Sequence, residues 1–369
     1  MGRLRRADCS TAGISRRGRG RGFEYRDPEG GRVADPDTLE RIAALAIPPA
    51  WTDVWICPDP DGHLQALGTD AAGRRQYRYH DRWRARRDRE KFERMLEFAR
   101  ALPRVRRAAA RDLRRDGLPR ERVLACAVRL LDRGFFRIGG EEYAGENGSY
   151  GLATLERRHV TLGDDGALVF DYVSKAGKRR QQGVVDPEVH EVVAALKRRR
   201  GRNPSLLAYR NGRWVDVHAA DVNEYIREAA GDDFSAKDFR TWHATVLAAV
   251  ALAVSTEARS KTARTRAISR AVAEVAGYLG NTPAVCRASY IDPRVFDRYR
   301  AGVTIAPALD GLGSADGPAT QGRVEAAVLG LLDDSGAVTR PNGGSATARP
   351  AGRRAGARRG RRARDTSRT

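Results

Sequence analysis

The chain has 369 residues, a hydrophobic fraction of 41% and a formal net charge of +21. The length predicts two domains with tails, and the hydrophobic fraction is sufficient for a real core, which excludes a wholly disordered chain. The charge favours a polyanionic partner, either nucleic acid or an anionic membrane surface. The longest apolar stretch, 246–254, is too short to cross a bilayer, and the first residues lack the apolar segment of a secretory signal.

Cysteine and histidine usage argues against a metal site or a disulfide framework. The four cysteines lie far apart without metal-site or redox spacing, and the six histidines do not cluster in the sequence. Unpaired cysteines are typical of a reducing compartment. We therefore expect a soluble cytoplasmic protein that holds no metal and no cofactor.

The N-terminal part is predicted to be a short tail followed by a mainly β domain. Residues 1–21 are rich in arginine and glycine with little apolar content, which predicts disorder. Over 22–83, alternating apolar and polar residues between turn signals predict a small β-rich domain. The expected elements are strands at 51–57, 63–68 and 76–80 and one short helix at 38–45.

Residues 84–305 are predicted to form a mainly helical domain with an embedded β-hairpin. Apolar residues recur at helical spacing from 92 to 98 and again from 123 to 131. The fold class is therefore α+β. The other expected helices lie at 187–199, 222–230, 238–254 and 265–279, and the hairpin strands at 154–162 and 167–174.

Residues 306–369 are predicted to be a mostly disordered C-terminal tail. The segment is rich in glycine, alanine and arginine, and only 324–332 has the pattern of a lone helix. Eight arginines lie between 349 and 364, yet the rest of the chain stays strongly positive without them. The basic character thus belongs to the folded domains too, and the tail is expected to add nonspecific DNA affinity.

No common nucleotide, metalloenzyme or hydrolase motif occurs, and the candidate chemistry lies in cations beside structural boundaries. Arg137 follows two aromatic residues and precedes Gly139 and Gly140, which would let the backbone approach a ligand. Lys175 ends an apolar strand and opens a turn that ends at Lys178. Taken singly, each cation also has an ordinary interpretation. Arg137 could be a surface arginine at a helix end, and Lys175 could lie at a solvated hairpin tip.

Arg240 and Tyr290 complete the set of candidates. Arg240 lies near the start of an apolar helix, where a cation opposes the helix dipole unless an anion such as phosphate is bound. Its ordinary alternative is a salt bridge to Asp238 or another acid. Thr282 and Pro283 are a cap and first-turn pair for a short helix that carries Tyr290 about two turns on. A core tyrosine with a bonded hydroxyl is the ordinary alternative there.

These segments resemble the active-site region of type IB DNA topoisomerases, in particular the compact bacterial and poxvirus-type branch. The resemblance covers about residues 22–300, whereas the tails lie outside it. The stretches that carry it are Arg240–Thr245, Leu279–Tyr290, Ile47–Trp51, Gly62–Ala66 and Gln76–His80.

The resemblance implies a function and a set of catalytic side chains. It implies an enzyme that nicks one strand of duplex DNA through a 3′-phosphotyrosyl intermediate and lets the strand rotate. It also implies that positive and negative supercoils are relaxed, that religation needs neither ATP nor metal, and that the enzyme is associated with the nucleoid. The implied residues are Tyr290 as the nucleophile, Arg137 and Arg240 on the scissile phosphate, and Lys175 as the general acid.

Two positions depart from the pattern of the family. Asn281 matches a position that holds histidine in viral and eukaryotic relatives and asparagine in many bacterial ones. It would hydrogen-bond a phosphate oxygen without offering a proton. Ser174 stands where glycine is usual before the lysine, so Lys178 is kept as a rival to Lys175.

The residue types suit this chemistry. Attack on a phosphodiester builds negative charge around a pentavalent phosphorus, and arginine is always protonated and can donate to two oxygens at once. One such preorganised donor is worth roughly 3 kcal/mol. A lysine among other cations has a lowered pKa and can protonate the leaving 5′ oxygen. The same cations favour ionisation of a tyrosine, whose pKa is otherwise about 10.

One face of the β-rich domain is a candidate DNA contact. Two tyrosines alternate on its last strand and therefore lie on the same face. Such a face can contact phosphates and base edges in the major groove. Packing of both rings on the core of the domain is an alternative of equal weight. A monomer that clamps duplex DNA, with no membrane partner, follows from the first interpretation. The candidate contact residues are Arg74, Arg75, Gln76, Tyr77, Tyr79 and His80.

Two other functions remain open. A tyrosine site-specific recombinase shares the fold and the chemistry, but its usual His-x-x-Arg order is reversed at Arg240 and His243. The segment 22–82 is also unlike a recombinase arm-binding domain. A non-enzymatic basic DNA-binding protein is the second alternative, and it predicts that Tyr290 is dispensable.

Overall fold

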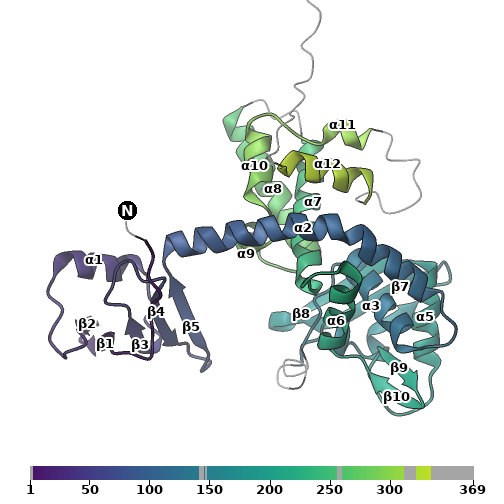
Figure 1. Cartoon of the computed structure of the whole chain (residues 1–369), viewed down its shortest axis with the longest axis horizontal. Coiled ribbons are helices and arrows are strands. Elements are labelled where there is room, and N and C mark those ends of the chain that lie inside the picture. The colour runs from purple at the N-terminus through teal and green to yellow at the C-terminus, as the bar shows by residue number, and fades with distance from the viewer. Residues whose placement is uncertain (1–2, 141–144, 146–147, 256–259, 311–320, 334–369) are drawn as a thin grey trace, which may run out of the picture. The chain divides into compact units, whose positions relative to one another are not determined.

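The computed structural model describes residues 3–140, 145, 148–255, 260–310 and 321–333. Figure 1 follows the elements in chain order, first the strands of an N-terminal sheet and then a mainly helical region. This arrangement confirms the predicted α+β class. Within the described ranges no helix is long and apolar enough to cross a membrane.

The N-terminal domain is a five-stranded antiparallel sheet with the strand order β2-β1-β3-β4-β5. Its small core consists of Ile14, Ile42, Val54, Ile56 and Ala66, so the helix that carries Ile42 packs on the sheet. The predicted strands and helix between 38 and 80 are confirmed. The elements are β1 (Ile14–Arg19), β2 (Gly22–Arg26), α1 (Pro36–Ala44), β3 (Thr52–Ile56), β4 (Leu64–Thr69) and β5 (Arg75–Tyr79).

The expectation of disorder over 1–21 is wrong for 14–19, which form β1 between β2 and β3. Ile14 is buried in the core, and the guanidinium carbon of Arg16 lies 4.2 Å from the ring centroid of Phe23. Arg16 also donates to the carbonyl oxygen of Trp51 at 2.6 Å. Arginine stems can cover apolar rings while their charged ends bond the backbone, so an arginine-rich composition is compatible with an ordered strand.

A helix of 33 residues, α2 (Asp81–Leu113), follows the sheet. It is about 50 Å long. At its start, His80 accepts a backbone N–H of the first turn at 3.0 Å, and the ring of Trp83 meets that of His63 edge-on. Its buried face begins only at Phe92 and packs against the helices that follow. The helix therefore contributes to both domains.

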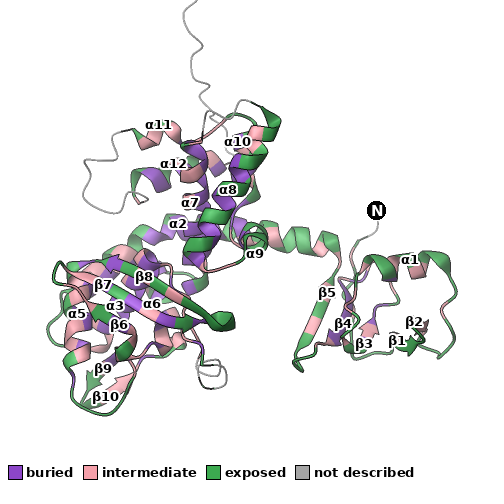
Figure 2. Ribbon diagram, turned by 180° about the vertical axis from the view of Figure 1, so that it is seen from behind, coloured by how far each residue is buried: buried purple, intermediate pink, exposed green. Residues whose placement is uncertain are grey.

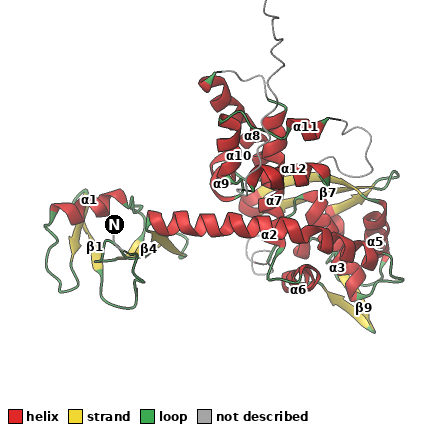
Figure 3. Ribbon diagram, turned by 45° about the horizontal axis from the view of Figure 1, so that its top comes forward, coloured by secondary structure: helices red, strands yellow, loops and turns green. Residues whose placement is uncertain are grey.

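The second domain packs helices around a large shared core and carries two small antiparallel sheets (Figure 3). Figure 2 shows buried residues concentrated where α7 (Ala236–Ala253) and α8 (Lys261–Leu279) pack together. All helices predicted between 84 and 279 are confirmed. The helices after α2 are α3 (Arg120–Gly134), α5 (Pro187–Arg198), α6 (Ala219–Ala230), α7 (Ala236–Ala253), α8 (Lys261–Leu279), α9 (Pro283–Ser289) and α10 (Pro293–Arg300).

A three-stranded sheet carries the predicted hairpin and extends it by one strand. The expected strand at 154–162 is shorter, because Leu152–Thr154 and Arg157–His159 are single turns of 3-10 helix. The sequence does not predict the third strand, since it is mostly polar and is held by its backbone pairing. The strands are β6 (Val160–Leu162), β7 (Ala167–Ser174) and β8 (Lys178–Val185), and a separate pair is β9 (Ala208–Asn211) with β10 (Arg213–Asp216).

The prediction of a mostly disordered tail from residue 306 is wrong for Ala306–Leu309, which form a helix, whereas the lone helix predicted at 324–332 is confirmed. α11 (Ala306–Leu309) and α12 (Arg323–Leu332) contact each other and α7, and the compact unit ends at Leu332. The buried side of α12 carries Glu325, which pairs with Arg106 at 2.5 Å. The four-residue helix α11 has no buried residue of its own, so its sequence pattern is weak. The tail from 334 onward lies outside the described residues.

Glu325 belongs to a buried polar cluster beneath α7. Arg106 donates to Asp132 at 2.8 Å as well as to Glu325, and the indole N–H of Trp242 donates to Glu325 at 2.9 Å. Nε2 of His243 lies 3.2 Å from Asp132. Buried charges are tolerated when each has partners, so removal of one member leaves the others unsatisfied.

A chain that ends at Leu332 is expected to unfold at the same temperature as the full chain, whereas one that ends at Asp310 is expected to be less stable. The shorter chain lacks α12, and loss of one partner from a buried ion pair costs about 3–5 kcal/mol. The corresponding decrease in Tm is roughly 10 °C. Thermal unfolding followed by circular dichroism measures both chains, and equal Tm values would show that α12 does not belong to the folded unit.

Candidate active site

Four of the five predicted catalytic residues line one pocket of about 360 Å³. They come from four separate segments of the helical domain. The fifth, Asn281, lies beside the pocket and accepts a hydrogen bond from Arg137 through its side-chain oxygen. The four that line the pocket are Arg137, Lys175, Arg240 and Tyr290.

Tyr290 is held at the end of α9 by backbone contacts on both sides. Thr282 caps the helix by accepting the N–H of Val285, and the N–H of Tyr290 donates to Cys286 at 3.0 Å. The hydroxyl of Thr245, which is fully buried on α7, lies 3.3 Å from the carbonyl oxygen of Tyr290. The predicted cap and short helix are confirmed, and the phenol is half-buried at the pocket wall.

Arg240 is 5% exposed and bridges two other segments of the site. Its guanidinium donates to the carbonyl oxygens of Phe135 at 2.8 Å and Leu279 at 2.9 Å. The alternative of a salt bridge to Asp238 is wrong, because that carboxylate accepts from Ser235 at the start of α7. The dipole argument also changes: the guanidinium reaches the negative C-terminal end of α8, which favours a cation.

The guanidinium of Arg240 also faces the candidate nucleophile. Its central carbon lies 5.3 Å from the ring centroid of Tyr290. Nε of Arg240 is buried and has no hydrogen-bond partner in the described part of the chain. An arginine whose two outer nitrogens are anchored on carbonyls is preorganised, and its remaining N–H groups are available for an anion.

Arg137 follows α3 at a sharp change of chain direction. Phe135 caps α3 in the left-handed conformation with φ 54°, and Arg137 then donates to the carbonyl oxygen of Gly280 at 3.2 Å. The role expected for the glycines after Arg137 differs from what the structure shows. A Cβ on Gly139 would lie 2.8 Å from Gly151, so this glycine permits two backbone segments to approach each other.

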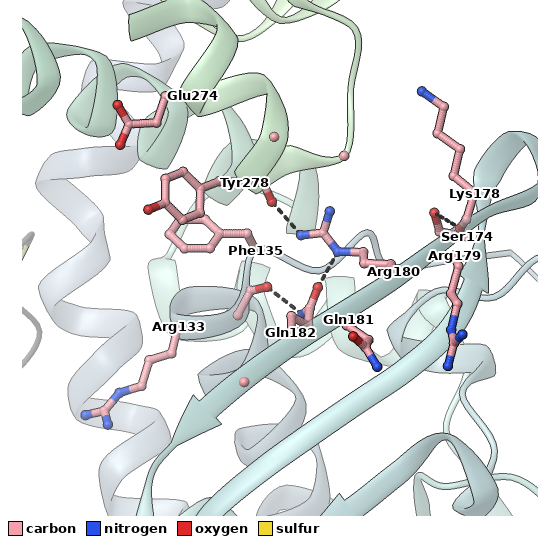
Figure 4. A pocket seen from close by; sticks show the side chains of 14 residues that line it. Arg133, Phe135, Ser174, Lys178, Arg179, Arg180, Gln181, Gln182, Glu274 and Tyr278 are labelled. Atoms are coloured by element: carbon pink, nitrogen blue, oxygen red, sulfur yellow. Dashed lines mark hydrogen bonds between the residues drawn. The ribbon is translucent and has the colours of Figure 1, made fainter.

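Lys175 and its rival Lys178 lie on different pockets. The turn between β7 and β8 places Ala176 at φ 67°, and Ser174 donates to the carbonyl oxygen of Lys178 at 2.9 Å. Serine in place of the usual glycine thus serves the hairpin. Lys175 lines the pocket with Tyr290, whereas Lys178 lines a second pocket of about 600 Å³ (Figure 4). The geometry favours Lys175 as the candidate acid.

The electrostatics of the pocket favour a charged phenol. Burial raises the pKa of Tyr290, but the positive charges of Arg240 and Arg137 outweigh burial and hold this pKa below its ordinary value. Burial lowers the pKa of Arg240 to about 10, and repulsion by Arg137 adds to the effect. Arg240 therefore stays protonated at neutral pH, and the tyrosine is the group that becomes easier to ionise.

Lys237 is a site residue that the sequence analysis does not single out. It lines the same pocket, and its charge also lowers the pKa of Tyr290. Lys237 and Arg240 are three residues apart on α7, a spacing that places both on one helix face. That spacing is the signal that could have found it. His243 lies one further turn along α7 and contacts Asp132 instead.

Lys237→Gln is expected to shift the pH dependence of strand cleavage upward. If Tyr290 is the nucleophile that the family resemblance implies, it reacts as phenolate, so the rate rises with pH until the pKa of Tyr290 is passed. Removal of a nearby cation raises that pKa, so the rate falls near neutral pH and recovers at alkaline pH. Single-turnover cleavage measured across pH checks this expectation. Lys261→Gln is the control, because Lys261 is the first residue of α8 and does not line the pocket. Superimposable pH profiles for the two variants would contradict the expected role.

The candidate DNA contacts of β5 separate into exposed and structural residues. Tyr77 and Tyr79 are 46% and 39% exposed, and their rings stack with centroids 6.1 Å apart, so the alternative of core packing is wrong. Arg75 is exposed as well. Arg74 is exposed too but pairs with Asp70 at 2.9 Å, whereas the half-buried His80 caps α2. Gln76 also bonds Asp70.

Comparison with known proteins identifies the family. Residues 80–308 match the family model of the eukaryotic DNA topoisomerase I catalytic core, and residues 22–70 match the bacterial DNA topoisomerase IB N-terminal domain. The DNA topoisomerase 1B of Acanthamoeba polyphaga mimivirus is 31% identical over 299 residues, which cover 78% of this chain and 88% of the viral protein. The chain belongs to the type IB DNA topoisomerase family. Its N-terminal domain is of the bacterial type.

Two fungal relatives match over shorter segments. The DNA topoisomerase 1 of Schizosaccharomyces pombe is 29% identical over 158 residues, 42% of this chain and 18% of the fungal protein. That of Candidozyma auris is 30% identical over 112 residues, 30% of this chain and 15% of the fungal protein. The chain therefore spans less than a fifth of either fungal relative, and the similarity to the viral protein is far more extensive.

Proposed function

We propose that this chain relaxes supercoiled duplex DNA by cutting and resealing one strand through Tyr290. The observation that carries the proposal is the convergence of Tyr290, Arg137, Arg240 and Lys175 on one pocket. A phenol with a lowered pKa among fixed cations is suited to attack a phosphodiester, which is itself an anion. The names of the matched relatives support DNA as the substrate.

In the cleavage step, the phenolate oxygen of Tyr290 forms a bond to phosphorus and the bond from phosphorus to the 5′ oxygen breaks. The phenol proton is lost to solvent beforehand, which the cations of the pocket favour. Arg137 and Arg240 hold the non-bridging oxygens as charge builds on the phosphorus. The products are a 3′-phosphotyrosyl bond and a 5′ hydroxyl end.

The leaving oxygen needs a proton, and we assign its donation to Lys175 at the tip of the β7–β8 hairpin. We assign to Asn281 a hydrogen bond to a non-bridging oxygen. Its amide can donate a hydrogen bond but cannot transfer a proton at neutral pH, so Asn281 is not the acid. Religation reverses the step: the 5′ hydroxyl attacks the phosphotyrosine and returns its proton to Lys175. The energy of the broken bond is retained in the phosphotyrosyl bond, so ATP is not required.

We propose duplex DNA bound by one copy of the chain as the productive complex. The exposed Tyr77 and Tyr79 with Arg75 form a face suited to stacking and phosphate contacts, whereas Arg74, Gln76 and His80 already have partners within the domain. Binding through many arginines releases counterions from DNA. The affinity for DNA is therefore expected to fall steeply as the salt concentration rises.

Incubation with supercoiled plasmid in EDTA without ATP tests the proposal. Relaxation of any plasmid, whether its supercoils are positive or negative, is the expected result. Relaxation or joining only of DNA that carries particular paired sites would indicate a recombinase instead. Binding without any change in linking number would indicate a non-enzymatic DNA-binding protein, and either of these results would overturn the proposal.

A further inference from the structure

The C-terminal end of α8 gathers three arginines. Three consecutive carbonyl oxygens each accept a hydrogen bond from a different guanidinium group. A helix C-terminus presents unpaired carbonyl groups and a partial negative charge, both of which stabilise cations. The donor pairs are Arg180 to Tyr278 at 2.5 Å, Arg240 to Leu279 at 2.9 Å and Arg137 to Gly280 at 3.2 Å.

Two of these arginines line the pocket of Tyr290, and the third, Arg180, does not. Burial lowers the pKa of Arg180, and the charge of Arg137 lowers it further, so the three cations repel one another. In the described part of the chain their hydrogen bonds go to carbonyl, amide and phenol oxygens, with no carboxylate among the acceptors. The end of α8 therefore offsets the repulsion.

Arg180 also connects this helix end to the other segments of the site (Figure 4). Its Nε donates to the side-chain oxygen of Gln182, whose amide donates to the carbonyl oxygen of Gly134 at 2.6 Å. Gly134 is the last residue of α3, and Arg137 follows three residues later. One chain of hydrogen bonds thus joins α8, β8 and α3.

The surroundings of Arg180 are built to keep it in place. Gly280 has φ 62°, a conformation that favours glycine, and a Cβ there would lie 2.5 Å from Nη1 of Arg180, so a side chain at this position would displace the guanidinium. Across the hairpin, Arg180 pairs in register with Tyr172, which is buried and stacks on Phe136. Phe136 directly precedes Arg137.

We propose that Arg180 is a positioning residue for strand cleavage. It ties the end of α8, which delivers Asn281, to the strand beside Lys175 and to the segment of Arg137. Without it, Asn281 and Arg137 lose their common support, and their alignment on the phosphate deteriorates while the DNA-binding surface is unchanged. This inference rests on the proposed function, because alignment matters only if the pocket cleaves DNA.

The test compares Arg180→Ala with Arg179→Ala, the neighbouring arginine of β8 that pairs with Asp171. Single-turnover adduct formation on a duplex with a short leaving strand gives the cleavage rate constant, and the same changes in a Tyr290→Phe background give the affinity for duplex. Arg180→Ala is expected to slow cleavage by roughly 10- to 100-fold with the affinity nearly unchanged. Arg179→Ala is expected to cleave at the rate of the unaltered chain.

Two further variants show whether Arg180 acts through the aligned residues. In an Asn281→Ala background, loss of Arg180 is expected to cost much less than in the unaltered chain, because coupled residues are non-additive. Arg180→Lys keeps the charge but lacks the planar fork of N–H groups that reaches Tyr278 and Gln182 together, so it is expected to cleave at an intermediate rate. This variant also serves as the test if Arg180→Ala does not fold, as judged by thermal unfolding.

The outcomes separate the two proposals. If the unaltered chain forms no adduct, the proposed function and the role of Arg180 are both overturned. If the unaltered chain forms the adduct and folded Arg180 variants do so at the same rate, only the role of Arg180 is overturned. Equal losses in Arg179→Ala and Arg180→Ala, or additive losses with Asn281→Ala, overturn it as well, because they indicate a general effect of charge or stability.

Discussion

Tyr290→Phe is expected to abolish relaxation and covalent adduct formation while the affinity for duplex DNA stays nearly the same. Phenylalanine preserves the ring that packs near Arg240 but removes the only oxygen in this position that can bond phosphorus. The loss of a single hydroxyl changes binding by about 1 kcal/mol at most, which is less than a tenfold change in Kd. Plasmid relaxation, adduct detection on denaturing gels and a binding titration measure the three properties.

The control for this change is Tyr209→Phe, which removes a hydroxyl from a half-buried tyrosine on β9, outside the pocket. It is expected to relax plasmid at the normal rate. Adduct formation that persisted in Tyr290→Phe would mean that another residue is the nucleophile. That result would remove the basis for the mechanism, although membership of the family would stand.

Arg240→Ala is expected to slow cleavage by about 10²- to 10³-fold, the effect of removing one preorganised donor from a site of developing charge. The same change removes the cation that lowers the pKa of Tyr290 most, so the pKa of the phenol rises and cleavage reaches its full rate only at a higher pH. Arg240→Lys separates the two effects. It keeps a positive charge, so the pH dependence stays close to normal, but it lacks the planar fork of N–H groups by which the guanidinium donates to Phe135 and Leu279 and also faces the pocket.

Arg199 provides a matched control for Arg240. It is also a buried arginine that donates to two backbone carbonyl groups, those of Ser205 and Leu206, but it lies outside the pocket. Arg199→Ala is expected to lower the free energy of unfolding and to leave the cleavage rate per folded molecule unchanged. If Arg199→Ala and Arg240→Ala slowed cleavage equally at equal folded concentration, the loss would be one of stability and not of catalysis.

The helices of the second domain could be predicted from the sequence because each buries an apolar face at helical spacing. Other elements could not. β8 is polar and exists through its pairing with β7, and β1 is arginine-rich and ordered by contacts with Phe23 and Trp51. α11 has no buried residue of its own and is held by its contacts with α7 and α12. In each case the stabilising partner lies elsewhere in the chain, so no local pattern reports it.

The candidate site shows the same division. Arg137, Lys175, Arg240 and Tyr290 could be named from short motifs and a family resemblance, because their local context is distinctive. How they are held could not be deduced, since the anchors are backbone carbonyl groups at the end of α8. Lys237 and Arg180 belong to none of these motifs. Their expected roles come from the residues that the fold places next to them.

The most direct test of the account is the identification of the covalent bond to DNA. The unaltered chain would be trapped on a nicked duplex in EDTA without ATP, digested with protease and analysed by mass spectrometry. The account predicts a peptide that carries a nucleotide on Tyr290 through a 3′ phosphate, together with a free 5′ hydroxyl end on the released strand. A bond to any other residue, or linkage through a 5′ phosphate, would contradict it.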